Sequence, residues 1–191
     1  MQVMPFEKQL SDGVALFLLG PEHTDEYFAL IDSNRQRLRK WFCWVDETKT
    51  TDDTRVFAEN ARKRWAERSG VVAGIRCEGR MAGVVAVENV DMRHETAHLL
   101  YLLDEEYEGK GLVAQACKAL LDCAFGDFGL NRIELRICPS NERSRNVALR
   151  LGFQYEGTLR QAAKGSDGYE DHEVYSMLKA EWAARRPEVK V

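Results

Sequence analysis

The chain of 191 residues lacks a long apolar run, and its longest wholly apolar stretch spans a handful of residues. A helix that crosses a membrane needs about 20 such residues, so none is expected here. The first residues, 1–7, also lack the charged and apolar regions of a signal peptide. The five cysteines form an odd set without CxxC spacing. This usage is typical of reduced, mostly buried cysteines and predicts a cytoplasmic protein.

An excess of positive charge is missing too. Twenty-seven basic and 31 acidic residues give a net charge of -4, which argues against a primary nucleic-acid binder. The mildly acidic balance could still attract a basic polypeptide substrate. His94, His172 and Glu173 are scattered without metal-ligand spacing, so no metal site is expected. No linker, repeat or low-complexity segment divides the chain, and we expect a single domain over residues 1–191.

The apolar residues that are present follow both strand and helix periods. They predict a mixed α/β protein with a strand–helix–strand connection in its middle. The expected strands cover residues 14–19, 71–77, 80–87, 97–103, 133–137 and 174–178. The expected helices cover residues 25–41 with a break near Asn34, a segment from Thr51, and residues 112–124 and 144–151.

The most informative stretch is the turn Gly109-Lys110-Gly111, which joins the apolar run 99–103 to a helix that starts near Leu112. A glycine turn before a helix exposes unpaired backbone N–H groups at the positive end of the helix dipole, which favours a phosphate. The absent side chains would let a pyrophosphate approach the backbone, and Lys110 adds a cation. A tight turn with a solvated lysine is the alternative interpretation.

A second segment, residues 141–153, opens with Asn141 and closes with Gly152-Phe153. Together the two segments resemble the cofactor-binding elements of the GNAT superfamily of acetyl-CoA-dependent N-acetyltransferases. Residues 169–176 resemble the Y-x-D-x-x-x-Y-S ending of its RimJ/RimL branch, the ribosomal-protein N-terminal acetyltransferases, and residues 37–46 resemble an aromatic stretch of the same branch.

This resemblance implies a twisted, mostly antiparallel sheet of about six to seven strands. A central parallel pair would be splayed at the cofactor site, with flanking helices, acceptor-side helices over about 24–68 and an acetyl-CoA-binding core over about 97–153. A bulge in the strand 97–103 would free an N–H for the thioester oxygen. The implied cofactor-binding residues are Leu102, Leu103, Glu108, Gly109, Lys110, Gly111, Leu112, Val113, Ala114, Asn141, Ser144 and Asn146.

Three positions depart from the family pattern: Glu108 replaces Arg or Gln, Val113 replaces Gly or Ala, and Ala148 replaces a tyrosine that often serves as the general acid. By the same resemblance, Ser144 is the best match for the general acid, although it could instead be a hydroxyl that bonds its own helix start.

Two residues are candidates for the general base. Glu88 and His98 lie on adjacent predicted strands, but they could also be an exposed strand-end carboxylate and a core histidine. An α-amine with a pKa of about 8 is partly neutral at pH 7, so water could also suffice.

The predicted function is transfer of acetyl from acetyl-CoA, without a metal, to a primary amine, foremost the N-terminal α-amine of a protein or peptide. Trp41, Trp44 and Glu88 would then line the acceptor groove, although the aromatic pair could equally be core. The resemblance also implies a homodimer. The alternatives are an acetyltransferase for a small amine (an amino acid, polyamine or antibiotic) and a non-catalytic CoA-binding domain.

Overall fold

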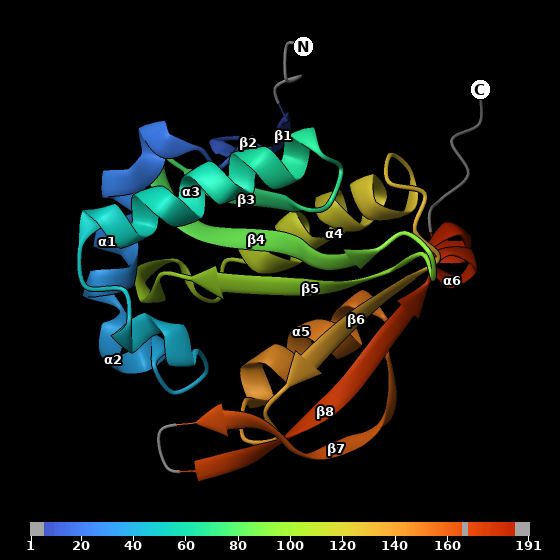
Figure 1. Cartoon of the computed structure of the whole chain (residues 1–191). Coiled ribbons are helices and arrows are strands. Elements are labelled where there is room, and N and C mark those ends of the chain that lie inside the picture. Colours follow the sequence, from blue (N-terminus) through green and yellow to red (C-terminus); the bar gives the residue numbers. More distant parts are fainter. Residues whose placement is uncertain (1–5, 166–167, 186–191) are drawn as a thin grey trace.

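The computed structural model describes residues 6–165 and 168–185. Within them, one sheet of eight strands runs in the order β1-β2-β3-β4-β5-β6-β8-β7 (Figure 1). The strands are β1 Glu7–Ser11, β2 Val14–Leu18, β3 Val71–Cys77, β4 Arg80–Asp91, β5 Thr96–Leu103, β6 Arg132–Ile137, β7 Gln154–Gly165 and β8 Gly168–Leu178. The α-helices are α1 Thr24–Ser33, α2 Arg35–Leu38, α3 Thr51–Ala66, α4 Leu112–Phe125, α5 Glu142–Leu151 and α6 Lys179–Arg185. Short 3-10 turns are η1 Pro21–His23, η2 Cys43–Asp46 and η3 Glu105–Tyr107.

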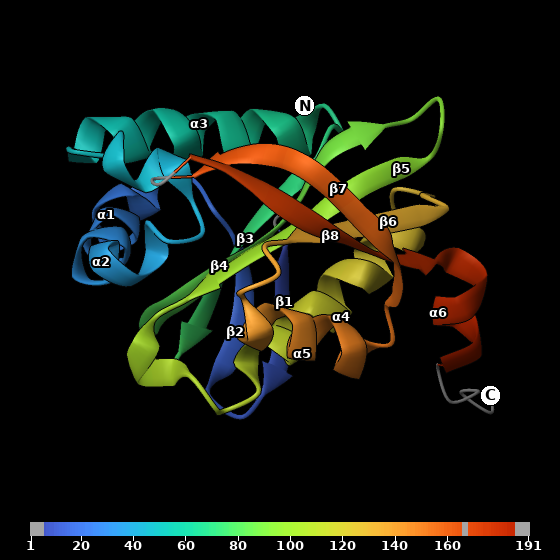
Figure 2. The same ribbon diagram turned by 90° about the horizontal axis from the view of Figure 1, so that it is seen from below.

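Helices cover both faces of the sheet. Figure 2 shows α3 on one side of the strands and α4 and α5 on the other. The buried residues fall into two clusters accordingly: α1 to α3 pack on one face of β3 to β5, and α4 and α5 pack on the opposite face. Because side chains alternate along a strand, residues 84 and 86 of β4 face α1 and α3, whereas residues 85 and 87 face α4.

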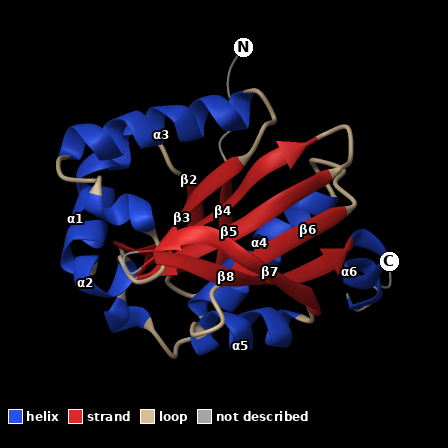
Figure 3. Ribbon diagram, turned by 60° about the horizontal axis from the view of Figure 1, so that its bottom comes forward, coloured by secondary structure: helices blue, strands red, loops and turns tan. Residues whose placement is uncertain are grey.

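The neighbouring strands are antiparallel except for β5 and β6, which are parallel. These two pair only through residues 96–98 and 132–134. Beyond His98, β5 pairs only with β4 as far as Leu103, and β6 pairs only with β8. The expected splayed parallel pair is therefore present, and Figure 3 shows α5 and the β7–β8 hairpin on the β6 side of it.

The predicted break in the first long helix is also present, at Asn34. The side chain of Asn34 donates to the carbonyl of Leu30 at 3.0 Å and is buried. Its Oδ1 accepts from the backbone N–H of Glu105 at 3.1 Å. An asparagine that bonds to local backbone competes with helix continuation, and here it also ties α2 to the segment after β5.

The sheet has more strands than the six to seven expected, because β1 and most of β7 carry little periodic apolar signal. Both strands are largely exposed on each face, in contrast to β3 and β4. The strand predicted over residues 174–178 extends back to Gly168 for the same reason.

Candidate active site

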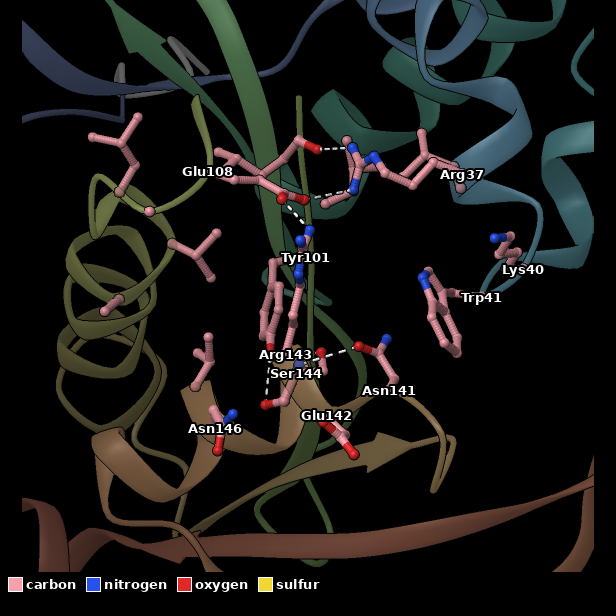
Figure 4. A pocket seen from close by; sticks show the side chains of 18 of the residues that line it. Arg37, Lys40, Trp41, Tyr101, Glu108, Asn141, Glu142, Arg143, Ser144 and Asn146 are labelled. Atoms are coloured by element: carbon pink, nitrogen blue, oxygen red, sulfur yellow. Dashed lines mark hydrogen bonds and ion pairs between the residues drawn. The ribbon is translucent and has the colours of Figure 1, made fainter. Parts of the chain in front are cut away.

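A cleft of about 860 Å³ lies where β5 separates from β6 (Figure 4). Its sides come from the end of α2 and the segment after it, from the end of β5, from the turn before α4, and from the first turns of α4 and α5. A volume of this size is in the range of small-molecule sites. It is lined by most of the residues predicted to bind the cofactor, namely Leu102, Leu103, Glu108, Gly109, Gly111, Leu112, Val113, Ala114, Asn141, Ser144 and Asn146.

The free edge of β5 supplies backbone hydrogen-bonding groups to this cleft. The N–H of Asp104 donates to Ala82 at 2.8 Å, which fixes the alternation of the antiparallel ladder with β4. Even-numbered residues of β5 therefore bond to β4, and the N–H groups of Tyr101 and Leu103 point away from it. The bulge expected near Leu102 is not present: the pairing of residues 98–103 with β4 is continuous, and the irregularity lies in β4 between Glu88 and Asp91. Ordinary strand alternation, not a bulge, directs these N–H groups to the splay.

The glycine turn has the geometry of an anion site. Gly109 and Gly111 have φ values of +77° and +73°, which glycine adopts readily and other residues rarely do. A Cβ at either position would meet no atom within 4 Å. Gly111 caps α4, whose first N–H groups have no partner within the helix. Lys110 does not line the cleft; its Nζ lies 4.7 Å from the centre of the Tyr107 ring.

Glu108 joins two arginines from opposite sides of the cleft. Arg37 Nη1 donates to Glu108 Oε1 at 3.0 Å, and Arg143 bonds to Glu108 Oε2 (Figure 4). Arg37 also donates to the carbonyl of Leu103, which closes the end of the free β5 edge. Glu108 therefore acts as the partner of two cations at the position where the family pattern has a cation or an amide. Sequence reasoning did not identify Arg37 or Arg143.

Ser144 lies against a second hydroxyl that the sequence did not identify. Ser144 Oγ donates to Tyr101 Oη at 2.8 Å, and Tyr101 Oη donates to the carbonyl of Ser144 at 3.2 Å. Asn141 caps α5 by accepting from the N–H of Ser144 at 3.1 Å. Burial raises the pKa of Tyr101 and outweighs the hydrogen bond from Ser144, so the phenol stays protonated. The sequence feature that could have identified Tyr101 is its hydroxyl, which is the only one in the apolar run 99–103.

A smaller pocket of about 70 Å³ lies on the α1–α3 side of β5. It contains Trp44 and Glu88, whereas Trp41 lines the main cleft. Phe42, Tyr101 and Leu102 line both spaces. The residues predicted for the acceptor are thus divided between two adjoining spaces.

The two candidate bases are cross-strand neighbours, as expected. Glu88 Oε1 accepts from Arg64 Nη1 at 2.5 Å. His98 Nε2 lies 3.6 Å from Glu134 Oε2, and its Nδ1 lies 3.3 Å from the amide nitrogen of Asn89. Burial lowers the pKa of His98, and Arg136 lowers it further, so the ring is neutral at pH 7. Glu88 lies at the small pocket, while His98 lines neither space.

Within residues 6–165 and 168–185, no three His, Cys, Asp or Glu side chains converge as a possible metal site. In the same residues, no helix is both long and apolar enough to span a bilayer.

Comparisons with known proteins agree with this geometry. Residues 15–154 match the family described as acetyltransferase (GNAT) domain. YdaF of Bacillus subtilis (strain 168), which has the provisional name of a ribosomal N-acetyltransferase, is 31% identical over 182 residues, or 95% of this chain and 100% of YdaF. The ribosomal-protein-serine acetyltransferase of Escherichia coli (strain K12) is 27% identical over 170 residues, or 89% of this chain and 95% of that protein.

A solved structure shares the fold. RimL, a ribosomal L7/L12 alpha-N-protein acetyltransferase in complex with coenzyme A, superposes with a TM-score of 0.87, covering 91% of this chain and 98% of that chain at 22% identity. Since the family model spans most of the chain and one relative is 31% identical over nearly all of it, this chain belongs to the GNAT acetyltransferases and is an N-acetyltransferase of the RimJ/RimL type.

Proposed function

We propose that this enzyme transfers acetyl from acetyl-CoA to the N-terminal α-amine of a protein or peptide, with residues 1–191 acting as one catalytic domain. The observation that carries the proposal is the convergence in one cleft of a free strand edge, a glycine-capped helix N-terminus and a pair of hydroxyls. The names of the two relatives, a ribosomal N-acetyltransferase and a ribosomal-protein-serine acetyltransferase, favour a protein acceptor.

The chemistry of the main cleft fits acetyl-CoA. Its lining contains four cationic side chains, Arg37, Lys40, Arg143 and Arg150, and two carboxylates, Glu108 and Glu142. A surplus of cations and the N-terminus of α4 suit phosphate groups. The pantetheine arm resembles a peptide, so the free edge of β5 can pair with it as another strand would.

The residues of the cleft then perform three tasks. The turn at Gly109–Gly111 binds the phosphates, and the outward N–H groups of Tyr101 and Leu103 stabilise negative charge on the thioester oxygen during attack. The amine nitrogen forms a bond to the acetyl carbon and loses one proton to a base or to water, and the carbon–sulfur bond breaks. Ser144, supported by Tyr101, donates a proton to the departing thiolate.

The amine must be neutral to attack. Glu88 and His98 are the proposed bases, and both lie on the α1–α3 side of the sheet, near the small pocket. Because an α-amine has a pKa about two units below that of a lysine side chain, more of it is neutral at physiological pH. This difference favours the α-amine over lysine as the acceptor.

We also propose a homodimer in the cytoplasm. Large apolar side chains are exposed on the β7–β8 hairpin, including Tyr155, Leu159 and Tyr169, and a second copy could cover them. All five cysteines are free, which fits a reducing compartment. Light scattering on the purified protein tests the assembly, and twice the mass of 21.8 kDa is the expected result.

The function is tested by turnover. Acetyl-CoA and the purified enzyme are incubated with unblocked peptides, and free thiol is measured alongside peptide mass. Release of thiol that depends on a peptide with a free N-terminus supports the proposal. Tight CoA binding without thiol release from any peptide or small amine would instead indicate a non-catalytic CoA-binding domain.

A further inference from the structure

The small pocket of about 70 Å³ lies on the α1–α3 face of β4 and β5. Its floor consists of two pairs of cross-strand neighbours on that face, Val84 with Leu102 and Ala86 with Leu100. Aromatic side chains of α1, α3 and the segment after α2 form its walls: Tyr27, Phe42, Trp44 and Phe57. The pocket is therefore a small apolar space on the part of β5 that has no neighbour on its β6 side.

This pocket adjoins the N–H groups that are proposed to bind the thioester oxygen. Those groups belong to Tyr101 and Leu103, and the residue between them, Leu102, lies on the floor of the pocket. Phe42, Tyr101 and Leu102 line both the pocket and the main cleft, so the two spaces are adjacent. The hydroxyls of Tyr101 and Ser144, which serve the sulfur in the proposed reaction, lie on the opposite face of the sheet, beside α5.

The shape of a thioester decides which of its substituents is directed to the pocket. The oxygen, the sulfur and the alkyl carbon lie in one plane around the carbonyl carbon, and an amine attacks from above or below that plane. With the oxygen at the edge of β5 and the sulfur beside Ser144, the alkyl carbon is directed to the other face of the sheet. The small pocket lies on that face. The pocket is therefore placed for the alkyl end of the acyl group.

The lining of the pocket defines which acyl groups it can hold. Among the described residues that line it, Glu88 is the only charged one, and its carboxylate accepts from Arg64 at 2.5 Å. The other lining residues are aliphatic or aromatic. A methylene group is similar in size to a water, whose share of liquid volume is about 30 Å³, so the pocket of about 70 Å³ holds about two methylene groups.

We propose that the enzyme also transfers propionyl and butyryl groups from their CoA thioesters, with the alkyl chain bound in the small pocket. This inference rests on the proposed function, because it uses the same thioester site and the same amine. The amine nitrogen bonds to the acyl carbon and loses one proton, the carbon–sulfur bond breaks, and the thiolate gains one proton. Hexanoyl exceeds the pocket. Succinyl has as many carbons as butyryl but would bring a second carboxylate beside Glu88.

Calorimetry without an acceptor tests the pocket independently of turnover. The purified enzyme is titrated with acetyl-, propionyl-, butyryl-, hexanoyl- and succinyl-CoA. A buried methylene tightens binding about fourfold, so butyryl-CoA should bind roughly tenfold more tightly than acetyl-CoA. Hexanoyl-CoA should bind no more tightly than butyryl-CoA, because its last carbons stay outside the pocket. Succinyl-CoA should bind at least about tenfold more weakly than butyryl-CoA, because its carboxylate loses water without gaining a partner.

Substitutions on β4 identify the pocket as the cause. Ala86→Val narrows the floor and should abolish the gain of butyryl-CoA over acetyl-CoA. Val84→Ala widens the floor and should tighten hexanoyl-CoA relative to butyryl-CoA. Val85→Ala is the matched control: it makes the same change on the same strand, but Val85 is fully buried on the α4 side and lines neither space. The affinity for free CoA, measured for each variant, shows whether the main cleft is intact.

Transfer is measured with one peptide that has a free N-terminal glycine, and mass spectrometry identifies the acyl group that is added. We expect kcat/KM with propionyl-CoA and butyryl-CoA to lie within about threefold of the value with acetyl-CoA, and hexanoyl-CoA and succinyl-CoA to react at least about tenfold more slowly.

The outcomes separate the two proposals. Equal affinity for acetyl-CoA and butyryl-CoA, or a gain that Ala86→Val leaves as Val85→Ala leaves it, would overturn the pocket assignment while the proposed function stands. Transfer of acetyl but not of propionyl or butyryl would do the same. Absence of transfer from every donor, acetyl-CoA included, would overturn both.

Discussion

The hydroxyls of Tyr101 on β5 and Ser144 on α5 lie 2.8 Å apart at the floor of the cleft. Ser144 donates to Tyr101, and Tyr101 donates to the backbone carbonyl of Ser144, so each hydroxyl proton has a partner. A thiolate that accepts the proton of Ser144 would leave Tyr101 able to turn its own proton toward Ser144. We propose that the pair takes the role of the helix tyrosine whose position is occupied here by Ala148, which is fully buried.

This pairing predicts non-additive kinetics. Ser144→Ala should lower kcat by about 100-fold, within the range of general acid catalysis, with little change in the KM for acetyl-CoA. Tyr101→Phe should lower kcat less, and the double variant should be no slower than Ser144→Ala, because both residues act in one proton transfer. Steady-state kinetics on the three variants check this. An unchanged kcat in Ser144→Ala would mean that Ser144 has no role in proton transfer and only forms hydrogen bonds near the start of its helix.

The glycine turn gives a second prediction. Gly111→Val should weaken CoA binding severely, because its side chain would extend where the pyrophosphate approaches and its backbone would be strained at a φ of +73°. Gly79→Val is the matched control, since Gly79 has a φ of +81° and also has open space around a Cβ. Calorimetry should show weak CoA binding only in the first variant. Wild-type affinity in a folded Gly111→Val protein would contradict a phosphate site here.

The ion pairs of Glu108 give a third prediction, which concerns the affinity for CoA. Glu108→Gln removes the negative partner of Arg37 and Arg143, so CoA should bind about threefold more tightly at low ionic strength, with the gain lost at high salt. Glu106→Gln changes net charge equally, but Glu106 does not line the cleft. Weaker binding of Glu108→Gln at all salt concentrations would mean that Glu108 chiefly holds Arg37 on the Leu103 carbonyl.

The candidate bases differ in their pH signature. Burial keeps the pKa of His98 below its ordinary value of 6.5, so His98 can accept a proton at neutral pH and loses that capacity as the pH falls through this lowered pKa. If His98 is the base, His98→Asn should remove the acidic limb of the kcat profile and Glu88→Gln should keep it. The reverse result would identify Glu88 as the base. An acidic limb that persists in both variants would mean that neither residue is the base and that water deprotonates the amine.

The sequence predicted most of the helices and strands whose buried apolar side chains recur with a helix or strand period. The turn at Gly109–Gly111, the break at Asn34 and the helix cap at Asn141 are local signals with local causes. The strand β7 escaped prediction because its side chains are exposed on both faces and leave no apolar alternation. Its length and its pairing with β8 follow from backbone hydrogen bonds that any polar sequence can make.

The site residues were predictable only where a single segment of the chain contains the whole motif. Tyr101 and Ser144 are 43 positions apart, and the 71 positions between Arg37 and Glu108 include three strands. Such contacts depend on how β5 separates from β6 and on how α2 and α5 approach the gap. No residue pattern along the chain specifies those distances.

The most direct test of the central claim is to locate the acetyl group on a reacted peptide. The enzyme is incubated with acetyl-CoA and a peptide that has a free N-terminus of alanine and several internal lysines, and tandem mass spectrometry assigns each acetyl group. We expect acetylation at the N-terminal α-amine, with one free thiol released per acetyl group. Acetyl groups found mainly on the lysine side chains, with the N-terminus unmodified, would contradict the proposed function.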